Sequence, residues 1–293
     1  MARRYSPTAA ERQAREEARA DQLTRLHQQL TAGVLELVKG ESWQAMLAAA
    51  ARFHTYSWRN CLLIMAQMPD ATQVAGYRTW QSFGRQVRKG ERSLAVIAPV
   101  TYRRNDEDEK AEEVDDSPAR QIRGWKIEHV FDISQTDGES VPSIEVNHVE
   151  GDAPEGLWDG LAAQVSAAGF ALLREATPGL PSANGSMSRG ELTVRVREDL
   201  GPAQACKTLA HEVAHMELGH GTATCTNSRS RSEVEAESVA YVVATSSGLD
   251  TSAYSFPYIG TWAPAGKEAE VMAETAERVV ATARRILATL EAA

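Results

Sequence analysis

Hydrophobic residues recur at helical spacing through most of the N-terminal part of the chain. The segment "LTRLHQQLTAGVLELV" repeats leucine and valine at steps of three and four, which is typical of the apolar face of a helix. The segments "SWQAMLAAAARFH" and "WRNCLLIMAQM" predict two more helices, and the second should end before Pro69. The first domain is therefore expected to begin with helices.

Beyond residue 74 the pattern changes to that of strands. "RSLAVIAPV" and "GWKIEHVFDISQT" are rich in β-branched and aromatic residues, which favour extended structure. We expect these segments to pair as an antiparallel hairpin. The stretch between them, residues 105–118, has eight acids and one lysine, so it is expected to be a solvated loop.

Helical and alternating patterns also follow each other in the C-terminal part. "LWDGLAAQVSAAGFALL" predicts a helix, and "ELTVRVRE" alternates apolar and polar residues like a half-buried strand. Gly201 and Pro202 should begin another helix, and two more are predicted near 230–248 and at the C-terminal end.

These patterns predict an α+β fold in two domains. Residues 1–138 would form helices with a small antiparallel sheet, and residues 156–293 a mostly helical domain with a short sheet. Residues 139–155 would link the two domains.

Composition narrows the class of protein. The chain is 43% hydrophobic and 24% charged, as in ordinary globular proteins. It has no apolar run of the ~20 residues that span a bilayer, and its basic start lacks the apolar core of a signal peptide. Three scattered cysteines are too few for a disulfide framework. We expect a cytoplasmic protein with no membrane partner.

The net charge of −9 is unevenly distributed. Residues 1–104 carry 16 Lys and Arg against 8 Asp and Glu, whereas residues 105–293 carry 15 against 32. A basic first third on an acidic chain predicts that this part contacts a polyanion.

The segment "TLAHEVAHMELGH" has the spacing of a metal site. His211 and His215 are four residues apart and would share one helix face. Glu212 beside them completes H-E-x-x-H, which combines two zinc ligands with a general base. The alternative is a structural helix that carries two histidines by chance. His220 does not fit the extended zincin spacing, and we expect it just past the helix end.

A third ligand is sought in "SEVEAESVAYVV". Glu233 and Glu237 share a helix face. We assign Glu233 as the ligand and Glu237 as the acceptor of the N–H of a ligating histidine. Glu235 should point elsewhere, onto a solvated face, while the apolar residues that follow should be buried. In the alternative, all three acids belong to a solvated face.

This arrangement predicts peptide hydrolysis. Zinc lowers the pKa of bound water towards ~7, and Glu212 would accept its proton. The strand "ELTVRVRE" is expected to lie at a sheet edge where an extended peptide could pair. Tyr254 and Tyr258 are candidate oxyanion donors, or equally core residues.

Arginines and aromatic residues alternate in the N-terminal half, a mixture that suits single-stranded DNA: cations follow the backbone and rings stack under bases. Trp80 and Phe83 could instead be core residues, and "RQVRKGER" a solvated basic hairpin. The candidate DNA-binding residues are Tyr56, Trp58, Arg59, Arg78, Trp80, Arg85, Arg88 and Lys89.

Two resemblances extend this interpretation. "TLAHEVAHMELGH" followed by "EVEAESVA" resembles the ImmA/IrrE zincin-like metallopeptidases. That resemblance implies zinc bound by His211, His215 and Glu233, with Glu212 catalytic.

The N-terminal half resembles the single-stranded-DNA-binding domain of ArdC-type antirestriction proteins. The resemblance rests on "FHTYSWRNCLLIMAQMP", "VAGYRTWQSFGRQVRKGE", "SLAVIAPV" and "VFDISQTDG", in this order. It implies protection of entering plasmid or phage DNA against host restriction. The acidic run at 106–116 is a departure from the pattern expected of a DNA-binding domain, because its charges would repel phosphates if it lay near the DNA groove.

Three functions remain open. The chain could be an antirestriction-type protein with a DNA-binding domain and a zinc metallopeptidase-like domain. It could be a regulatory metallopeptidase that cleaves a repressor or another protein. It could also be a non-catalytic DNA-binding protein whose zinc is structural.

Overall fold

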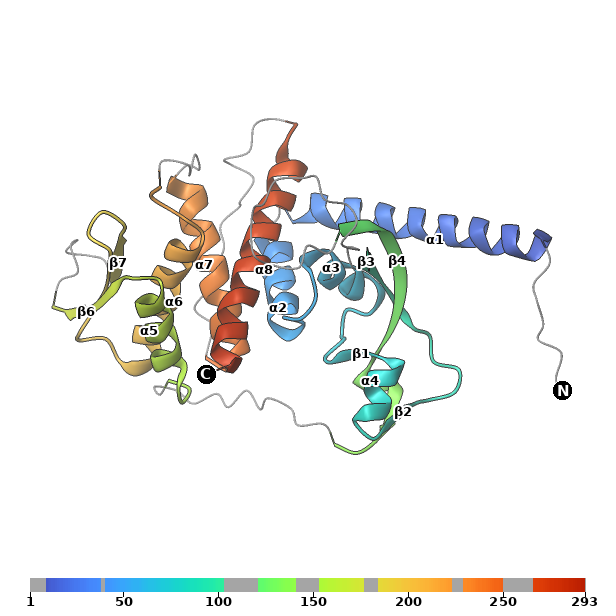
Figure 1. Cartoon of the computed structure of the whole chain (residues 1–293), viewed down its shortest axis with the longest axis horizontal. Helices are drawn as coiled ribbons and strands as arrows, with labels where there is room; N and C mark the ends of the chain where they lie inside the picture. Colours follow the sequence, from blue (N-terminus) through green and yellow to red (C-terminus); the bar gives the residue numbers. More distant parts are fainter. Residues whose placement is uncertain are drawn as a thin grey trace, which may run out of the picture. The chain divides into compact units, whose positions relative to one another are not determined.

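The chain folds as an α+β protein, seen here as a computed structural model that describes residues 9–37, 40–102, 121–140, 153–176, 184–222, 229–249 and 266–292 (Figure 1). The predicted acidic loop and most of the predicted linker lie outside these residues. Its contacts define two units. The first unit comprises Met1–Gln29 and Leu63–Val141, and the second comprises Leu30–Leu62 and Pro142–Ala293.

The predicted N-terminal helices are confirmed. They are α1 (Ala9–Glu36), α2 (Gly40–Arg52) and α3 (Trp58–Gln67). All of α2 and the end of α1 belong to the second unit, so residues 30–62 pack with residues that follow much later in the sequence.

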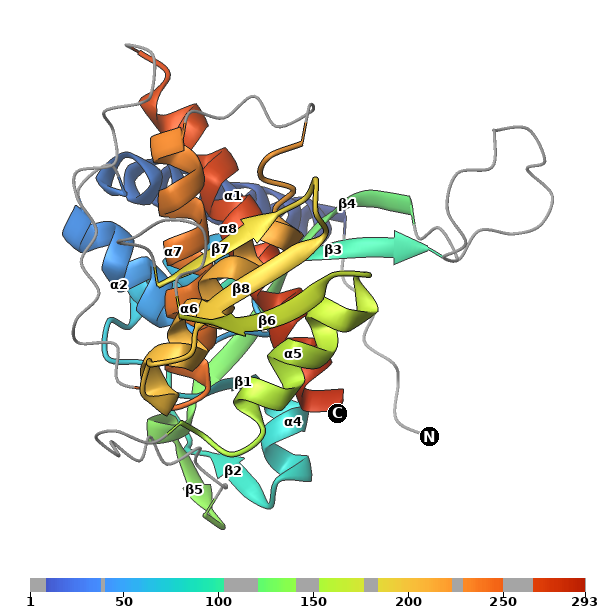
Figure 2. The ribbon, with the colours of Figure 1, turned by 90° about the vertical axis from the view of Figure 1, so that its left-hand side faces the viewer.

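A three-stranded antiparallel sheet forms the main part of the first unit. β3 (Leu94–Tyr102) and β4 (Gln121–Asp132) pair along their length, with Ile97 opposite Ile127, which confirms the predicted hairpin (Figure 2). β1 (Val74–Gly76) pairs with the other side of β4. The sheet order is β1-β4-β3.

A smaller antiparallel pair joins β2 (Arg85–Val87) to β5 (Thr136–Gly138), next to the short helix α4 (Tyr77–Ser82). The turn η1 (Ile133–Gln135) leads into β5, and the buried Asp132 caps it by accepting from the Ser134 N–H. The other oxygen of Asp132 accepts from the backbone N–H of Thr72 at 2.7 Å. One buried carboxylate thus connects the segment before β1 with the end of β4.

The second unit is built around α7 (Arg229–Ser246). This helix contacts α2, α6 (Pro202–Glu217) and α8 (Glu268–Ala292), while α5 (Leu157–Ala167) contacts α6 and α8. The indole of Trp43 in α2 donates to Ser238 Oγ in α7 at 3.0 Å. The apolar part of α7 from Val239 to Ala244 is buried on every side, as predicted.

The second unit also contains a short mixed sheet in the order β6-β8-β7, with α5 and α6 beside it (Figure 2). Its strands are β6 (Ala171–Glu175), β7 (Gly185–Ser188) and β8 (Thr193–Arg197). The prediction that "ELTVRVRE" is an edge strand is wrong, because β8 pairs with a strand on both sides. β7 is an edge that contacts α6.

The predicted alternation in β8 holds for Val194 and Val196, which are fully buried. Leu192 lies before the strand, at a φ of 50°, and is exposed. Among the residues that the structure describes, none of the helices combines the length and apolar character needed to cross a membrane.

Candidate metal centre and nucleic-acid-binding residues

The two histidines of the H-E-x-x-H motif face each other on α6. Pro202 in the first turn begins this helix, and one turn separates the two rings. Nε2 of His211 lies 3.0 Å from Nε2 of His215. Both ring nitrogens therefore point at one place.

Glu233 approaches the same place from α7. Its Oε2 lies 3.5 Å from Nε2 of His211 and 3.6 Å from Nε2 of His215. The three ligand atoms all lie within 4.8 Å of one another. Two imidazoles and one carboxylate form a donor set that suits zinc and other divalent ions, and they leave a coordination position for water.

Glu237, one turn after Glu233, fixes the orientation of the first histidine. Its Oε2 lies 2.9 Å from Nδ1 of His211. An ionised carboxylate accepts hydrogen bonds only, so Nδ1 carries the proton in this contact. When the ring is neutral, Nε2 of His211 therefore carries the lone pair that a metal ion would bind.

The acids change how the site titrates. Burial lowers the pKa of His211, but the hydrogen bonds with Glu233 and Glu237 outweigh it and raise that pKa to about 10. Hydrogen bonds with both histidines hold the pKa of Glu233 well below its usual range, and burial lowers the pKa of His215. Without a metal, the carboxylate of Glu233 and the protonated ring of His211 form an ion pair.

Glu212 is buried between α6 and β7, with 6% of its surface exposed. Burial raises its pKa to about 7, against the opposing effect of His211. A Cβ added to Gly185 in β7 would come within 2.8 Å of Oε1 of Glu212. The carboxyl therefore packs directly against the edge strand, and its pKa suits proton transfer near neutral pH.

The expectation for Glu235 is wrong. It is fully buried rather than solvated, and Oε2 lies 3.1 Å from Nε2 of His220. Arg231 and Arg278 also bind this carboxylate, at 2.9 and 3.2 Å. The sequence contained one indication that Glu235 is buried. Arg231 and Glu235 lie one turn apart, on a helix whose following residues are apolar on every side, so the two can form an ion pair inside the protein.

His220 lies past the end of α6, as predicted, but it is buried against the site, and its Nδ1 is 2.8 Å from Nδ1 of His215. Sequence reasoning missed this contact. Tyr254 and Tyr258 lie outside the described residues.

The candidate DNA-binding residues fall into both units. Tyr56, Trp58 and Arg59 belong to the second unit. Trp58 is 2% exposed, and its indole donates to Glu277 at 2.7 Å. Arg59 binds the same carboxylate at 2.8 Å. The ring of Trp58 is therefore not available to stack on a base.

Trp80, in the first unit, is 2% exposed and donates to the carbonyl of Phe131 at 2.9 Å. This is the core role that the sequence left open as an alternative. Phe83 packs edge-on to Trp80 but is 50% exposed.

The cations of the first unit differ in how they are bound. Arg85 donates to Thr136 and to the carbonyls of Gly138 and Glu139, and thus ties β2 to β5. Arg88 pairs with Glu91 and Asp137. Arg78 and Lys89 are exposed.

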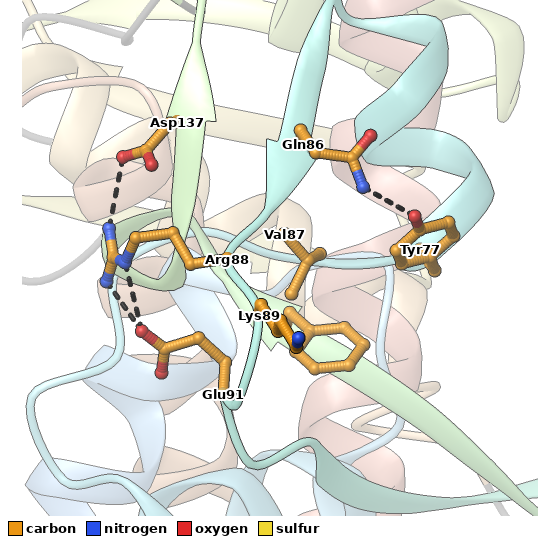
Figure 3. Close-up of a pocket in the computed structure, with 8 residues that line it drawn as sticks. Tyr77, Gln86, Val87, Arg88, Lys89, Glu91 and Asp137 are labelled. Carbon is orange, nitrogen blue, oxygen red and sulfur yellow. Dashed lines mark hydrogen bonds and ion pairs between the residues drawn. The ribbon is translucent and has the colours of Figure 1, made fainter.

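A pocket of about 600 Å³ lies in the first unit. Figure 3 shows Arg88 turned towards Asp137 and Glu91 on one side, and Gln86 bound to the Tyr77 hydroxyl on the other. Its lining residues are Tyr77, Gln86, Val87, Arg88, Lys89, Glu91, Phe131 and Asp137.

Three exposed aromatic residues of the first unit were not among the candidates. Tyr77 is 43% exposed, Phe83 50% and Trp125 56%. Phe83 belongs to the alternating arginines and aromatic residues of the sequence, with a core role as its alternative, but it was not among the final candidates. Nothing in the local pattern separates these rings from the buried Trp80, because exposure depends on which element packs over each ring.

Residues 16–131 match the family model described as the N-terminal domain of the anti-restriction factor ArdC. The matched region includes the helices α2 and α3 and the sheet of the first unit.

Two other proteins are similar to a longer part of the chain, one of them in two crystal structures. The uncharacterised protein pXO2-81 of Bacillus anthracis is 26% identical over 82% of this chain and 46% of its own length, so the chain spans about half of this curated relative. The metal-free crystal structure of the antirestriction protein ArdC from plasmid R388 is 20% identical, covers 80% of this chain and 84% of that chain, and has a TM-score of 0.48. The Mn(II)-bound structure is 18% identical, with 81% and 88% covered and a TM-score of 0.45.

Proposed function

We propose that this protein binds single-stranded DNA through its ArdC N-terminal domain and acts in antirestriction, protecting entering plasmid or phage DNA. The family match at residues 16–131 carries this proposal. The DNA-binding domain would comprise residues 1–138, and a zinc metallopeptidase-like domain residues 156–293, after a linker at 139–155. Residues 30–62 of the first domain pack in the second unit, so the two domains would share structural elements.

The surface proposed for DNA differs from the sequence-based candidates. Trp58 and Trp80 are left out because both are buried. Their place is taken by the exposed rings of Tyr77, Phe83 and Trp125. Bases stack on exposed aromatic faces at about 1–3 kcal/mol each, without sequence preference.

Cations supply the other part of a single-strand site. Arg78 and Lys89 are exposed. Lys89 and Tyr77 line the same pocket. A base beside Tyr77 with its phosphate near Lys89 would use both features. Arg85, whose donors hold β2 to β5, would support this surface rather than bind DNA.

We propose zinc as the ion of the second domain, held by His211, His215 and Glu233, with Glu237 orienting His211. When bound, the ion would polarise a peptide carbonyl and lower the pKa of a bound water. Glu212, with a pKa near 7, would accept the proton of that water, and the edge strand β7 could pair with an extended peptide.

The DNA proposal is tested by anisotropy titration of the full chain with a labelled single-stranded oligonucleotide. We expect binding that weakens as salt rises, because phosphate contacts release counterions. Phe83→Ala should weaken binding, while Leu35→Ala, which removes an exposed apolar side chain of the second unit, would serve as the control. No binding at low salt, or binding indifferent to salt, would contradict the proposal.

The metal proposal is tested by metal analysis of the purified chain. We expect one zinc per wild-type chain and none in His211→Ala. His54→Ala is the matched control, because His54 also pairs with a glutamate, Glu291, at 3.0 Å. A wild-type chain that takes up no divalent metal would remove the proposed centre.

A regulatory metallopeptidase is the second candidate function, and the burial of Glu212 beside the two histidines favours it. Glu212→Gln keeps the shape of the side chain but cannot act as a base. If this variant binds zinc and keeps all cellular activity, hydrolysis is not the function. That outcome would favour the third candidate, a DNA-binding protein whose zinc is structural.

A further inference from the structure

The end of α6 carries a histidine back to the metal centre. Gly219 adopts a left-handed φ of 74°, and its N–H bonds to the carbonyl of Met216 at 3.2 Å. The next N–H, that of His220, bonds to the carbonyl of His215 at 3.0 Å. This is the Schellman ending of a helix. It places His220 directly beside His215.

The ring of His220 is bound at both nitrogens. Its Nδ1 lies 2.8 Å from Nδ1 of His215, and its Nε2 lies 3.1 Å from Oε2 of Glu235. His220 is 3% exposed and Glu235 is fully buried. The three side chains therefore form a buried row that runs from the metal-facing ring to a carboxylate.

Hydrogen-bond counting fixes the protons in this row. Arg231 and Arg278 bind Glu235, which favours its ionised form. An ionised carboxylate only accepts, so Nε2 of His220 donates to it. In the neutral ring, Nδ1 of His220 is then the acceptor. The proton between the two Nδ1 atoms therefore belongs to His215, and Nε2 of His215 keeps its lone pair.

That lone pair points to the proposed ion. Nε2 of His215 is the atom 3.0 Å from Nε2 of His211 and 3.6 Å from Glu233. Glu237 imposes the same tautomer on His211 from the other side of the site. Each of the two histidine ligands thus has its own partner, but only that of His215 is another histidine.

The backbone that carries His220 is also hydrogen-bonded to arginines. Arg189 donates to the carbonyl of His220 at 3.0 Å. Arg278, which binds Glu235, also donates to the carbonyl of Leu218 at 3.1 Å. Arginines thus bind the backbone on both sides of Gly219, while the ring of His220 is held by its contacts with His215 and Glu235.

We propose that His220 is a positioning residue of the metal centre: supported by Glu235, it accepts the Nδ1 proton of His215 and so presents Nε2 of His215 to the ion. This proposal rests on the metal-binding function proposed above. Outer partners of this kind are typically worth 10–100-fold in metal affinity.

The test compares two variants of nearly equal shape in the full chain. His220→Asn keeps an oxygen where Nδ1 was, so it can still accept the proton of His215. His220→Leu fills the same space without an acceptor. Both lose the contact with Glu235, so they should lose similar stability in thermal unfolding of the metal-free chain. Zinc affinity is measured by competition with a chelating dye.

We expect His220→Leu to bind zinc about 10–100-fold more weakly than wild type, with His220→Asn and the control His54→Leu close to wild type. Long-range ¹H–¹⁵N spectra of the zinc-loaded wild type should show the proton of His215 on Nδ1. Equal zinc affinity in the Asn and Leu variants, or a proton on Nε2 of His215, would overturn the proposal while the metal centre stands. Failure of the wild type to bind zinc would overturn both.

Discussion

The proposed metal centre and the proposed DNA surface use their side chains in opposite ways. The proposed centre consists of two half-buried histidines and the exposed carboxylate of Glu233, which bind one another. It is supported by a fully buried glutamate with two arginines. The proposed DNA surface consists of rings that the described residues of the first unit leave exposed, such as Trp125 at 56% exposed. The ligands of the proposed metal centre can be inferred from their spacing on helices. The residues of the proposed DNA surface can be identified only from their burial in the folded chain.

This contrast explains where the sequence-based candidates held and where they did not. One helical turn separates His211 from His215 and Glu233 from Glu237, so each pair faces one way wherever the helices lie. Trp80 and Phe83 are three residues apart at the end of α4, yet one is buried and the other half exposed. Helical spacing did not decide their exposure.

The largest effect should follow removal of the buried carboxylate. In Glu235→Ala, Arg231 and Arg278 lose the buried carboxylate that they share, although Arg231 keeps its contact with Glu274. Breaking a buried pair in this way costs about 3–5 kcal/mol. Urea unfolding measures the loss, with Glu268→Ala in the first turn of α8 as an acidic control. A loss as small as that of the control would show that the network is not needed for folding.

Two tryptophans test the contrast within one unit. Trp80→Ala removes a buried ring and its hydrogen bond to Phe131, and should lower the free energy of unfolding by about 3–5 kcal/mol. Trp125→Ala removes an exposed ring and should change stability by less than about 0.5 kcal/mol. Urea titration of both variants measures the difference. Similar losses for the two would mean that Trp125 is also a core residue.

For DNA binding, we expect Trp125 to matter more than Trp80. If a base stacks on Trp125, Trp125→Ala should weaken binding to a single-stranded oligonucleotide by about 1–3 kcal/mol. Anisotropy titration at fixed salt gives this value, and Leu35→Ala, an exposed apolar residue of α1 assigned to the second unit, is the control. An unchanged affinity would remove Trp125 from the proposed surface.

The pH dependence of zinc affinity tests the proposed metal centre. The pKa of His211 is raised to about 10 in the metal-free chain, above its ordinary 6.5. The stability from its protonated form is therefore complete below about pH 6.5 and is lost as pH rises towards 10. A metal must displace this proton, so zinc affinity should rise by about tenfold per pH unit in that window.

Dye competition at pH 7, 8 and 9 measures this dependence, once the titration of the dye itself has been subtracted. Thermal unfolding of the metal-free chain should show the opposite trend, with stability falling over the same range. Zinc affinity that does not change with pH would mean that no proton is displaced from His211.

The smallest effect is expected from single cations of the first unit. Lys89→Ala should reduce the salt dependence of single-strand binding by about 0.7 in the slope of log K against log salt, the value of one phosphate contact. Arg85→Ala should instead lower stability, because its guanidinium holds β2 to β5. Anisotropy at several salt concentrations separates the two. An unchanged slope in Lys89→Ala would exclude a phosphate contact at that residue.

The sequence alone determined the elements and the local pairs of this protein. Hydrophobic spacing located the N-terminal helices, the hairpin of β3 and β4 and the buried end of α7, and a four-residue repeat placed two histidines on one face of α6. Such features depend on the geometry of a single helix or of neighbouring strands, and that geometry is the same in any fold.

Tertiary structure decided the rest. It placed β8 in the centre of its sheet, buried Trp58 and Trp80, and brought Glu235 and His220 together behind His215. In each case the outcome depends on which element covers a given face, because burial and hydrogen bonding between distant residues are properties of packing. The spacing of hydrophobic residues along the sequence does not show which elements pack against each other.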